Sequence, residues 1–215
     1  MEIGTINLHD VLPDVFRGED INSEVWLRRL TFERGKTYCI DAASGTGKTS
    51  LCSFLYGIRR DYSGTITFDH SDIRTLKIAD WCELRRRHLA YLPQELDIFD
   101  ELSALDNVLL KNRLTDFKTE REIREMFERL EISHRLNAPC GRMSVGQRQR
   151  VALIRALCQP FDFILLDEPV SHLDSRSNAM CAAMISEEAS VSGAGVIYTS
   201  VGNQLAVKSP ILIKL

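Results

Sequence analysis

The sequence predicts an α/β fold in which a mostly parallel sheet carries one helical insertion. Residues 37–40 have a strand pattern and lead into a small-residue loop and a helical segment, so strand and helix alternate along the chain. Residues 161–166 form a nearly continuous apolar run, the pattern of a parallel strand that is buried on both faces. Between these segments, residues 78–144 change to the spacing of helices, which places the insertion there.

The composition is that of an ordinary globular protein. The chain has 215 residues, of which 44% are hydrophobic and 27% are charged, enough to bury a core. It carries 27 Lys and Arg against 30 Asp and Glu, a net charge of −3, whereas nucleic-acid-binding domains are usually basic. No apolar run approaches the roughly 20 residues that a membrane-spanning helix needs. We therefore expect no nucleic-acid partner and no membrane span, and we expect the six cysteines to be reduced, packed thiols.

The elements of the first third follow from local patterns and turn residues. Alternation of apolar and polar residues predicts strands, and glycine marks the turns between them. In chain order we expect a strand over 24–32, a turn at Gly35, a strand over 37–40, a loop over 41–47, a helix over 48–56 and a strand over 65–68.

The helical insertion is clearest over residues 118–131. Its apolar residues recur at i, i+3, i+4 and i+7 and so form one packed face, made of Ile123, Met126, Phe127 and Leu130. Thr119 followed by Glu122 predicts a capping box at the start of this helix. Beyond the insertion we expect a strand over 161–166, a helix over 175–189 and strands over 195–198 and 210–213.

Residues 42–49, Ala-Ala-Ser-Gly-Thr-Gly-Lys-Thr, follow an expected strand and open an expected helix. This is the context of a phosphate-binding P-loop, in which backbone N–H groups and a helix N-terminus face phosphate oxygens. Lys48 would reach the outer phosphates, and the Thr49 hydroxyl would ligate Mg²⁺. The motif has glycine where this chain has Ala42, which costs about 1–2 kcal/mol if positive φ is required and fits if only a small side chain is required. The residues expected to hold the nucleotide here are Ser44, Gly45, Thr46, Gly47, Lys48, Thr49 and Ser50.

Two carboxylates, Asp167 and Glu168, end the apolar run at 161–166. Ligands of open parallel sheets bind at the carboxyl ends of the strands, so this pair is expected beside the phosphate loop. Asp167 suits the metal shell, through Mg²⁺-bound water. Glu168 suits the alignment and deprotonation of an attacking water. The alternative interpretation of Asp-Glu-Pro by itself is a surface turn that ends a strand.

Residues 142–152, Arg-Met-Ser-Val-Gly-Gln-Arg-Gln-Arg-Val-Ala, separate this chain from most other P-loop proteins. They resemble the signature of the ATP-binding-cassette (ABC) ATPase family, Leu-Ser-Gly-Gly-Gln followed by a helix of the Gln-Arg-Val-Ala type. Ser144, Gly146 and Gln147 match, whereas Met143 and Val145 depart from it. Other landmarks of the family appear in the expected order along the chain, at residues 62–68, 90–94, 102–108 and 171–174. The resemblance therefore covers about residues 3–215.

The resemblance implies a RecA-like P-loop NTPase core over residues 1–77 and 155–215, and a helical subdomain over 78–154. It also implies ATP and Mg²⁺ as ligands. Gln94 matches the glutamine loop, so it would contact the metal and take part in catalysis, with Thr49 and Asp167 as the other metal-site residues.

In the family, two units pair head-to-tail around two ATP molecules. The signature residues Ser144, Gly146 and Gln147 would then face the γ-phosphate held by the other unit. Phe16 is the best-placed residue to stack on adenine. Ser200 stands where the family has a histidine at the γ-phosphate, and losing such a donor predicts slow hydrolysis, by about 100-fold to 1,000-fold.

The function implied is that of the ATP-binding and ATP-hydrolysing subunit of an ABC transporter. ATP-driven closure of a homodimer would move a separate integral membrane permease, which would hold this chain at the cytoplasmic, inner face of the cell membrane. One alternative is a hydrolysis-weak, ATP-gated regulatory clamp, suggested by Ala42, Val145 and Ser200. Another is a soluble ABC ATPase without a role in transport, although such members carry long insertions that this chain lacks.

Overall fold

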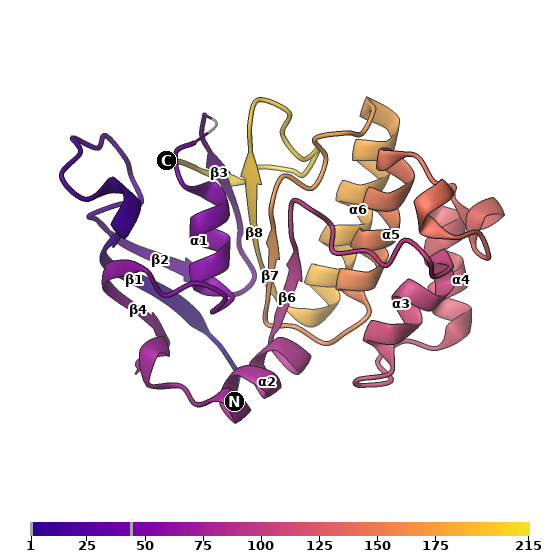
Figure 1. Cartoon of the computed structure of the whole chain (residues 1–215), viewed down its shortest axis with the longest axis horizontal. Coiled ribbons are helices and arrows are strands. Elements are labelled where there is room, and N and C mark those ends of the chain that lie inside the picture. The colour runs from indigo at the N-terminus through magenta and orange to yellow at the C-terminus, as the bar shows by residue number, and fades with distance from the viewer. Residues whose placement is uncertain (1, 44) are drawn as a thin grey trace.

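The computed structural model describes residues 2–43 and 45–215 and contains two sheets (Figure 1). The strands are β1 (Thr5–Pro13), β2 (Arg29–Glu33), β3 (Thr37–Asp41), β4 (Tyr62–Phe68), β5 (Ser71–Asp72), β6 (Leu89–Leu92), β7 (Phe163–Leu166), β8 (Gly195–Ser200) and β9 (Ile211–Lys214). The helices are α1 (Lys48–Leu55), α2 (Ile78–Arg87), α3 (Ala104–Asn112), α4 (Glu120–Arg129), α5 (Val145–Leu157) and α6 (Ser175–Ser192). One sheet is antiparallel, in the order β2-β1-β4-β5; the other is parallel, in the order β6-β7-β8-β3-β9. The predicted α/β fold with a parallel sheet is confirmed.

The parallel sheet separates two apolar cores. Alternate residues of β7 point to opposite faces, so that Phe163 and Leu165 belong to one core and Ile164 and Leu166 to the other. The first core lies between the two sheets and includes α1 and α2, whereas the second contains the buried faces of α3 to α6. Figure 1 shows the same division, with the antiparallel sheet on one side and α3 to α6 on the other. Burial on both faces is the physical reason for the apolar run in this strand.

The register of the parallel sheet brings the carboxyl ends of its strands to one edge. Asp41 of β3 pairs with Ser200 of β8, and Leu92 of β6 pairs with Leu166 of β7. The segments that leave these four strands therefore start side by side, at the edge where parallel sheets bind their ligands.

The strand expected over 24–32 is wrong in its first half, because β2 begins only at Arg29. The Ser23 hydroxyl accepts hydrogen bonds from the backbone N–H groups of Val25 and Trp26, both at 3.0 Å, and this bond pattern makes a turn. Leu27 then has a positive φ of 56°. Val25 and Trp26 of this turn are buried, which is why their apolar character resembled that of a strand.

Three strands were absent from the expectations: β1, the two-residue β5 and β6. β1 lies in the antiparallel sheet between β2 and β4, and β6 pairs with β7 although it falls inside the range expected to be helical. Trp81 and Leu84 of α2 also pack in the core between the two sheets. The division of the chain at residues 78 and 154 stays a prediction.

The capping box predicted for the helix over 118–131 is present at the start of α4. The backbone N–H of Thr119 donates to the Glu122 carboxylate at 2.7 Å, and the backbone N–H of Glu122 donates to the Thr119 hydroxyl at 3.2 Å. The predicted apolar face is buried in the core that contains α3 to α6.

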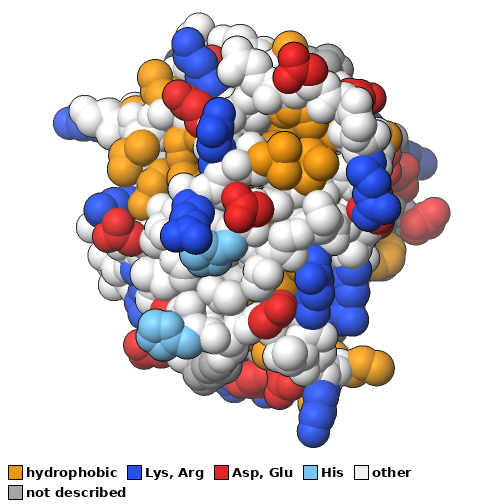
Figure 2. Space-filling view, turned by 90° about the vertical axis from the view of Figure 1, so that its left-hand side faces the viewer, with side chains coloured by type: hydrophobic (Ala, Val, Ile, Leu, Met, Phe, Trp, Pro, Cys, Tyr) orange, Lys and Arg blue, Asp and Glu red, His pale blue; other side chains and the backbone are white. Residues whose placement is uncertain are grey.

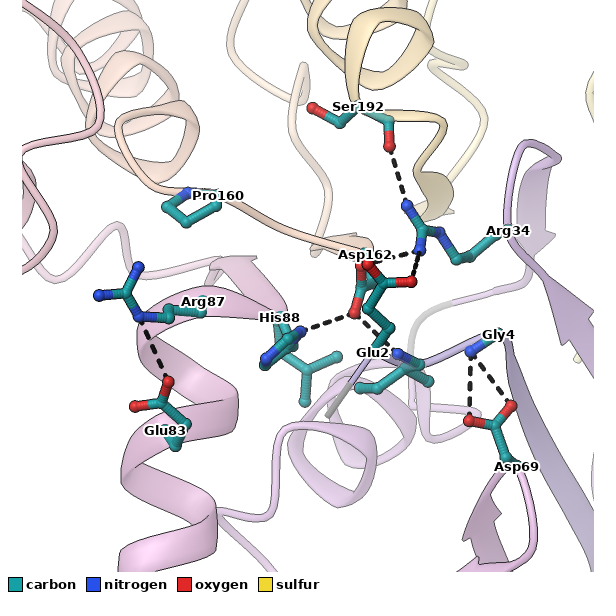
Figure 3. A network of polar contacts seen from close by, with 12 residues as sticks. Glu2, Gly4, Arg34, Asp69, Glu83, Arg87, His88, Pro160, Asp162 and Ser192 are labelled. Carbon is teal, nitrogen blue, oxygen red and sulfur yellow. Dashed lines mark hydrogen bonds and ion pairs between the residues drawn. The ribbon is translucent and has the colours of Figure 1, made fainter.

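A polar network around Asp162 fastens the other end of the parallel sheet (Figure 3). The Asp162 carboxylate accepts a hydrogen bond from the backbone N–H of Ile3 at 2.7 Å and lies 2.7 Å from His88 Nδ1 and 3.1 Å from the Arg34 guanidinium. Arg34 also donates to the carbonyl oxygen of Ser192 at 2.9 Å. Because Asp162 directly precedes β7, the network ties the start of the chain and the end of α6 to the amino end of this strand.

The surface of the antiparallel-sheet side mixes both signs of charge. Lys and Arg side chains lie among Asp and Glu side chains there, with apolar side chains between them (Figure 2). Among the residues that the structure describes, no helix combines the length and the apolar character that crossing a bilayer requires.

Candidate functional site

The loop between β3 and α1 needs glycine at two positions. Gly45 has a φ of 84° and Gly47 a φ of 100°, both in the region that residues with a side chain rarely adopt. A Cβ on Gly47 would also lie 3.0 Å from the Phe16 ring and 3.1 Å from the Trp26 ring. Ala42, by contrast, has no positive φ, so alanine in place of the usual glycine introduces no backbone strain. Ser44 lies outside the described residues.

Lys48, the first residue of α1, faces both the loop and the acidic pair. Its Nζ donates a hydrogen bond to the carbonyl oxygen of Ala43 at 2.7 Å and lies 3.9 Å from Glu168 Oε1. The Lys48 side chain is only 5% exposed. The sequence motifs around Lys48 and Glu168, 120 residues apart, therefore meet at one place.

Two adjacent pockets lie along this loop. The first has a volume of about 340 Å³, within the range of small-molecule sites, and is lined by Val15, Phe16, Gly45, Gly47, Lys48, Thr49, Ser50, Gln94 and Glu168. The second, of about 310 Å³, shares Phe16 and Gly45 with the first and adds Thr46, Trp26 and residues 19–22. Trp26 Nε1 donates to the carbonyl oxygen of Thr46 at 3.1 Å, which fixes the loop against this aromatic side. Phe16 thus stands between a polar pocket and a second one with aromatic walls.

The acidic pair is held by a threonine that the sequence analysis did not select. The Thr199 hydroxyl donates to Asp167 Oδ1 at 2.7 Å and accepts a hydrogen bond from the backbone N–H of Glu168 at 2.9 Å. Glu168 has a positive φ of 51°. Thr199 directly precedes Ser200 at the end of β8, and it reaches the acidic pair through the pairing of β7 with β8.

The oxygen atoms at this edge fit a Mg²⁺ ion. Asp167 is 1% exposed, and its Oδ2 has no hydrogen-bond partner among the described residues. The Thr49 hydroxyl lies 3.4 Å from Gln94 Oε1. Hydroxyl, amide and carboxylate oxygens are the ligands that Mg²⁺ uses in proteins. Burial raises the pKa of the nearby Cys52 thiol well above its usual range, and the negative charge of Asp167 raises it further.

Ser200 lies beside the phosphate loop but does not line the polar pocket. Its carbonyl oxygen accepts a hydrogen bond from the backbone N–H of Ala42 at 3.2 Å. The residue is 1% exposed, and its hydroxyl has no partner among the described residues. The predicted catalytic position therefore holds a short, buried side chain next to the start of the loop.

The signature residues form a separate surface at the start of α5. Ser144 caps α5: its hydroxyl accepts a hydrogen bond from the backbone N–H of Gln147 at 3.2 Å, and its backbone N–H donates to Gln147 Oε1 at 3.1 Å. Val145 is 42% exposed, and a Cβ on Gly146 would lie 3.1 Å from the His172 carbonyl oxygen. None of these residues lines the pocket at Lys48. Within one chain, the structure does not bring the signature to the phosphate loop.

A family comparison identifies the class to which this fold and site belong. The ABC transporter family model matches residues 28–171, so the chain belongs to the ABC transporter family. It is 32% identical over 175 residues to an uncharacterized ABC transporter ATP-binding protein of Mycobacterium tuberculosis, covering 80% of this chain and 53% of that relative. It is 33% identical over 160 residues to the lipoprotein-releasing system ATP-binding protein LolD of Syntrophotalea carbinolica, covering 73% of this chain and 70% of LolD. The chain thus spans about half the length of the mycobacterial relative.

A solved structure with the same fold is that of a dimeric bacterial ABC transporter cassette. The two chains superpose with a TM-score of 0.81 at 23% identity, over 97% of this chain and 94% of the other. The predicted P-loop NTPase architecture is therefore confirmed at the level of the fold.

Proposed function

We propose that this chain is the ATP-binding and ATP-hydrolysing subunit of an ABC transporter and works with Mg²⁺. The observation that carries the proposal is the 3.9 Å separation between Lys48 Nζ and Glu168 Oε1, at the pocket that the phosphate loop lines. A buried lysine and a carboxylate on either side of such a loop match the needs of phosphoryl transfer, which are charge neutralisation and a positioned water.

Each side chain has a role that follows from its place. The loop N–H groups and the Lys48 ammonium would hold the phosphates of ATP. Thr49, Gln94 and Asp167 would hold Mg²⁺, whose charge would polarise the phosphoryl oxygens. Glu168 would orient the attacking water and accept its proton. Phe16, on the wall between the two pockets, would stack on adenine.

The exposed signature segment supports a head-to-tail homodimer that closes on ATP. Ser144 and Val145 are exposed at the N-terminus of α5, a 13-residue helix whose first N–H groups attract anions. This end of α5 lies outside the chain's own nucleotide pocket, so a second copy would supply the γ-phosphate that it meets.

An apolar groove supports an integral membrane permease as the other partner. The groove has a volume of about 340 Å³ and includes Ile58, Phe99 and Leu114, which are 58%, 54% and 53% exposed. Lys111 lies in it, and burial lowers the pKa of its ammonium to about 8. The groove suits a short amphipathic helix of the permease that carries an acidic side chain. Binding there would place this chain at the cytoplasmic, inner face of the membrane.

Removing the lysine of the loop tests the nucleotide assignment. Lys48→Ala is expected to weaken ATP binding about tenfold to 150-fold, the loss of one charge-assisted hydrogen bond, and to abolish hydrolysis. Titration with ATP in a calorimeter measures the affinity. The matched control is Lys36→Ala, which removes an exposed lysine paired only with Glu33. Equal ATP affinity in the wild type and in Lys48→Ala would refute the nucleotide site.

Ser200 favours a second candidate function, a hydrolysis-weak ATP-gated clamp. Its buried hydroxyl does not line the pocket, so ATP would bind and close the dimer while turnover stays low. Wild-type turnover is expected to be about 100-fold or more below that of a family member with the histidine, and Ser200→His is expected to raise it. Turnover equal to that of the histidine protein, with no gain from Ser200→His, would exclude the clamp.

A soluble non-transport role would instead be indicated by co-purification with ribosomes or DNA rather than with a permease.

A further inference from the structure

Gln149 of α5 holds the backbone of the proposed catalytic carboxylate. The side chain of Gln149 is 2% exposed, and its Nε2 donates a hydrogen bond to the carbonyl oxygen of Glu168 at 3.1 Å. The hydrogen bond is long-range, across 19 residues, and joins α5 to the segment that directly follows β7. A buried bond of this kind fixes where the carbonyl lies and, with it, where the side chain of the same residue starts.

Glu168 needs such a hold because its backbone is strained. Its φ of 51° lies in the left-handed region, which a residue with a Cβ rarely adopts. Thr199 accepts the backbone N–H of Glu168 at 2.9 Å, which fixes one side of the residue. On the other side, the Ser171 hydroxyl donates to the Glu168 carbonyl at 3.2 Å, but Ser171 is exposed and water competes with it. The backbone N–H of Ser171 also donates to this carbonyl, at 3.3 Å. Gln149 is the donor whose side chain is buried.

The same helix starts with the signature segment. Gln149 follows Gln147 within one turn, and Arg150 donates to the carbonyl oxygens of Gly146 at 3.2 Å and of Leu130 at 2.8 Å. These bonds fasten the start of α5 to the segment that follows α4. A shift of this end of α5 is therefore passed on to Gln149 and then to Glu168.

We propose that Gln149 is a positioning residue, which couples the signature end of α5 to the placement of Glu168. When a nucleotide held by the second copy fixes the start of α5, Gln149 fixes Glu168 at its own nucleotide. The side chain of Gln149 itself touches neither ATP nor the attacking water. This inference rests on the proposed function and adds a route by which one site senses the other.

A second buried glutamine provides a matched control. Gln159 is 1% exposed, and its Nε2 donates to the carbonyl oxygen of Leu89 at 3.1 Å, at the amino end of β6. Gln149→Leu and Gln159→Leu therefore each remove a hydrogen bond from a buried glutamine to a backbone carbonyl. Gln159→Leu also removes a second one, to the Pro160 carbonyl oxygen at 3.3 Å. For Gln149→Leu we expect kcat to fall about tenfold to 100-fold while KM and the Kd for ATP stay within about twofold. For Gln159→Leu we expect reduced thermal stability but a kcat within about twofold of the wild type.

A glutamate in the same place gives a readout that general destabilisation does not. A carboxylate at position 149 cannot donate to the carbonyl of Glu168, but a protonated carboxyl can. The kcat of Gln149→Glu relative to the wild type should therefore rise as the pH is lowered from about 8 to about 6, because burial favours the protonated form. Gln159→Glu should show no such rise.

The outcomes separate this inference from the proposed function. If the wild-type protein neither binds nor hydrolyses ATP, both the proposed function and this inference are refuted. An active wild type with a fully active Gln149→Leu, or with equal loss of kcat in Gln149→Leu and Gln159→Leu, removes the coupling role alone. If Gln149→Leu does not fold, the pH profile of Gln149→Glu decides, and a profile parallel to that of the wild type overturns the inference.

Discussion

At the scale of single residues, one hydroxyl organises the two carboxylates of the site. The Thr199 hydroxyl uses its proton for Asp167 and its lone pair for the backbone N–H of Glu168. Asp167 keeps its second oxygen without a partner among the described residues, so one carboxylate oxygen is fixed and the other is available to the proposed Mg²⁺. The hydrogen bond from Thr199 orients the Asp167 carboxylate, so that its other oxygen has a fixed position.

Thr199→Val tests this role without changing the shape of the side chain. The substitution leaves the buried N–H of Glu168 without its partner and frees Asp167 Oδ1, so we expect the free energy of unfolding to fall by about 2 kcal/mol. We also expect kcat to fall more than ATP affinity, because Glu168 loses one of its two long-range hydrogen bonds. Urea denaturation and steady-state turnover measure the two effects.

The control is Thr65→Val, on a strand of the antiparallel sheet, whose hydroxyl makes no hydrogen bond to another described residue. Full stability of Thr199→Val would contradict the bridging role.

The site residues that could be predicted from the sequence differ from those that could not in how far along the chain their contacts reach. Lys48 and Glu168 are marked by their immediate neighbours, a small-residue loop and an apolar run, so local patterns were enough. Thr199 and Gln149 act through bonds across 31 and 19 residues. Gln149 lies in the segment over 142–152 that resembles the family signature and its helix, but that resemblance does not say which group its side chain bonds. Only the register of β7 with β8 and the packing of α5 bring them to the acidic pair.

At the scale of elements, the cap of α4 shows how local chemistry sets a boundary. The backbone N–H groups of Thr119 and Glu122 each donate a hydrogen bond to the side chain of the other residue. The helix begins at Glu120, directly after Thr119. The hydroxyl and the backbone N–H of Thr119 both donate to the Glu122 carboxylate, which lowers the pKa of that carboxyl. The bonds that the Glu122 carboxylate accepts contribute their full stability only while this carboxyl is ionised, whereas the bond from the Glu122 backbone N–H to the Thr119 hydroxyl does not depend on its charge.

The cap predicts a stability difference that depends on pH. Thr119→Ala should lower the free energy of unfolding by about 1 kcal/mol near pH 7. Because the pKa of Glu122 is lower in the folded chain, its contribution is fully present above the unfolded value of about 4.3 and is lost as the pH falls through the folded value. The difference between the wild type and Glu122→Ala in urea denaturation should therefore shrink at acid pH.

Glu128→Ala, on the same helix, is the control. Its side chain is exposed and makes no ion pair with another described residue, so it should give a smaller difference with little dependence on pH. Constant differences for Glu122→Ala between pH 7 and acid pH would rule out the cap as the source.

Elements were misplaced where burial and periodicity gave different signals. The turn over residues 24–27 buries Val25 and Trp26 and so imitates a strand, although Ser23 and the positive φ of Leu27 break the extended backbone. β6 has four residues, too few for a period to be recognised among the helices on either side. Pairing with β7 fixes β6, and pairing is a property of the sheet rather than of the segment.

At the scale of the whole molecule, the two edges of the parallel sheet have opposite roles. At the amino edge, the Asp162 network closes the sheet against the start of the chain and the end of α6. At the carboxyl edge, the loop at Lys48 and the acidic pair leave a pocket open. Among the described residues, the polar groups around Asp162 satisfy each other, whereas Asp167 at the other edge keeps a carboxylate oxygen without a partner, and this difference favours a polar ligand at the second edge.

A catalytically blocked protein tests whether two such molecules close on ATP. Glu168→Gln keeps the size of the side chain but removes the base, so ATP bound between two copies would persist and the dimer would accumulate. In size-exclusion chromatography with light scattering, we expect a dimer with ATP and Mg²⁺ and a monomer with ADP.

The substitution also changes the net charge of each copy from −3 to −2 and so weakens repulsion between the copies. Glu128→Gln makes the same charge change on an exposed helix face and should stay monomeric, as should the double variant Glu168→Gln/Lys48→Ala, which lacks the phosphate-binding lysine. A Glu168→Gln protein that binds ATP yet remains monomeric would contradict the head-to-tail mechanism while leaving the nucleotide site intact.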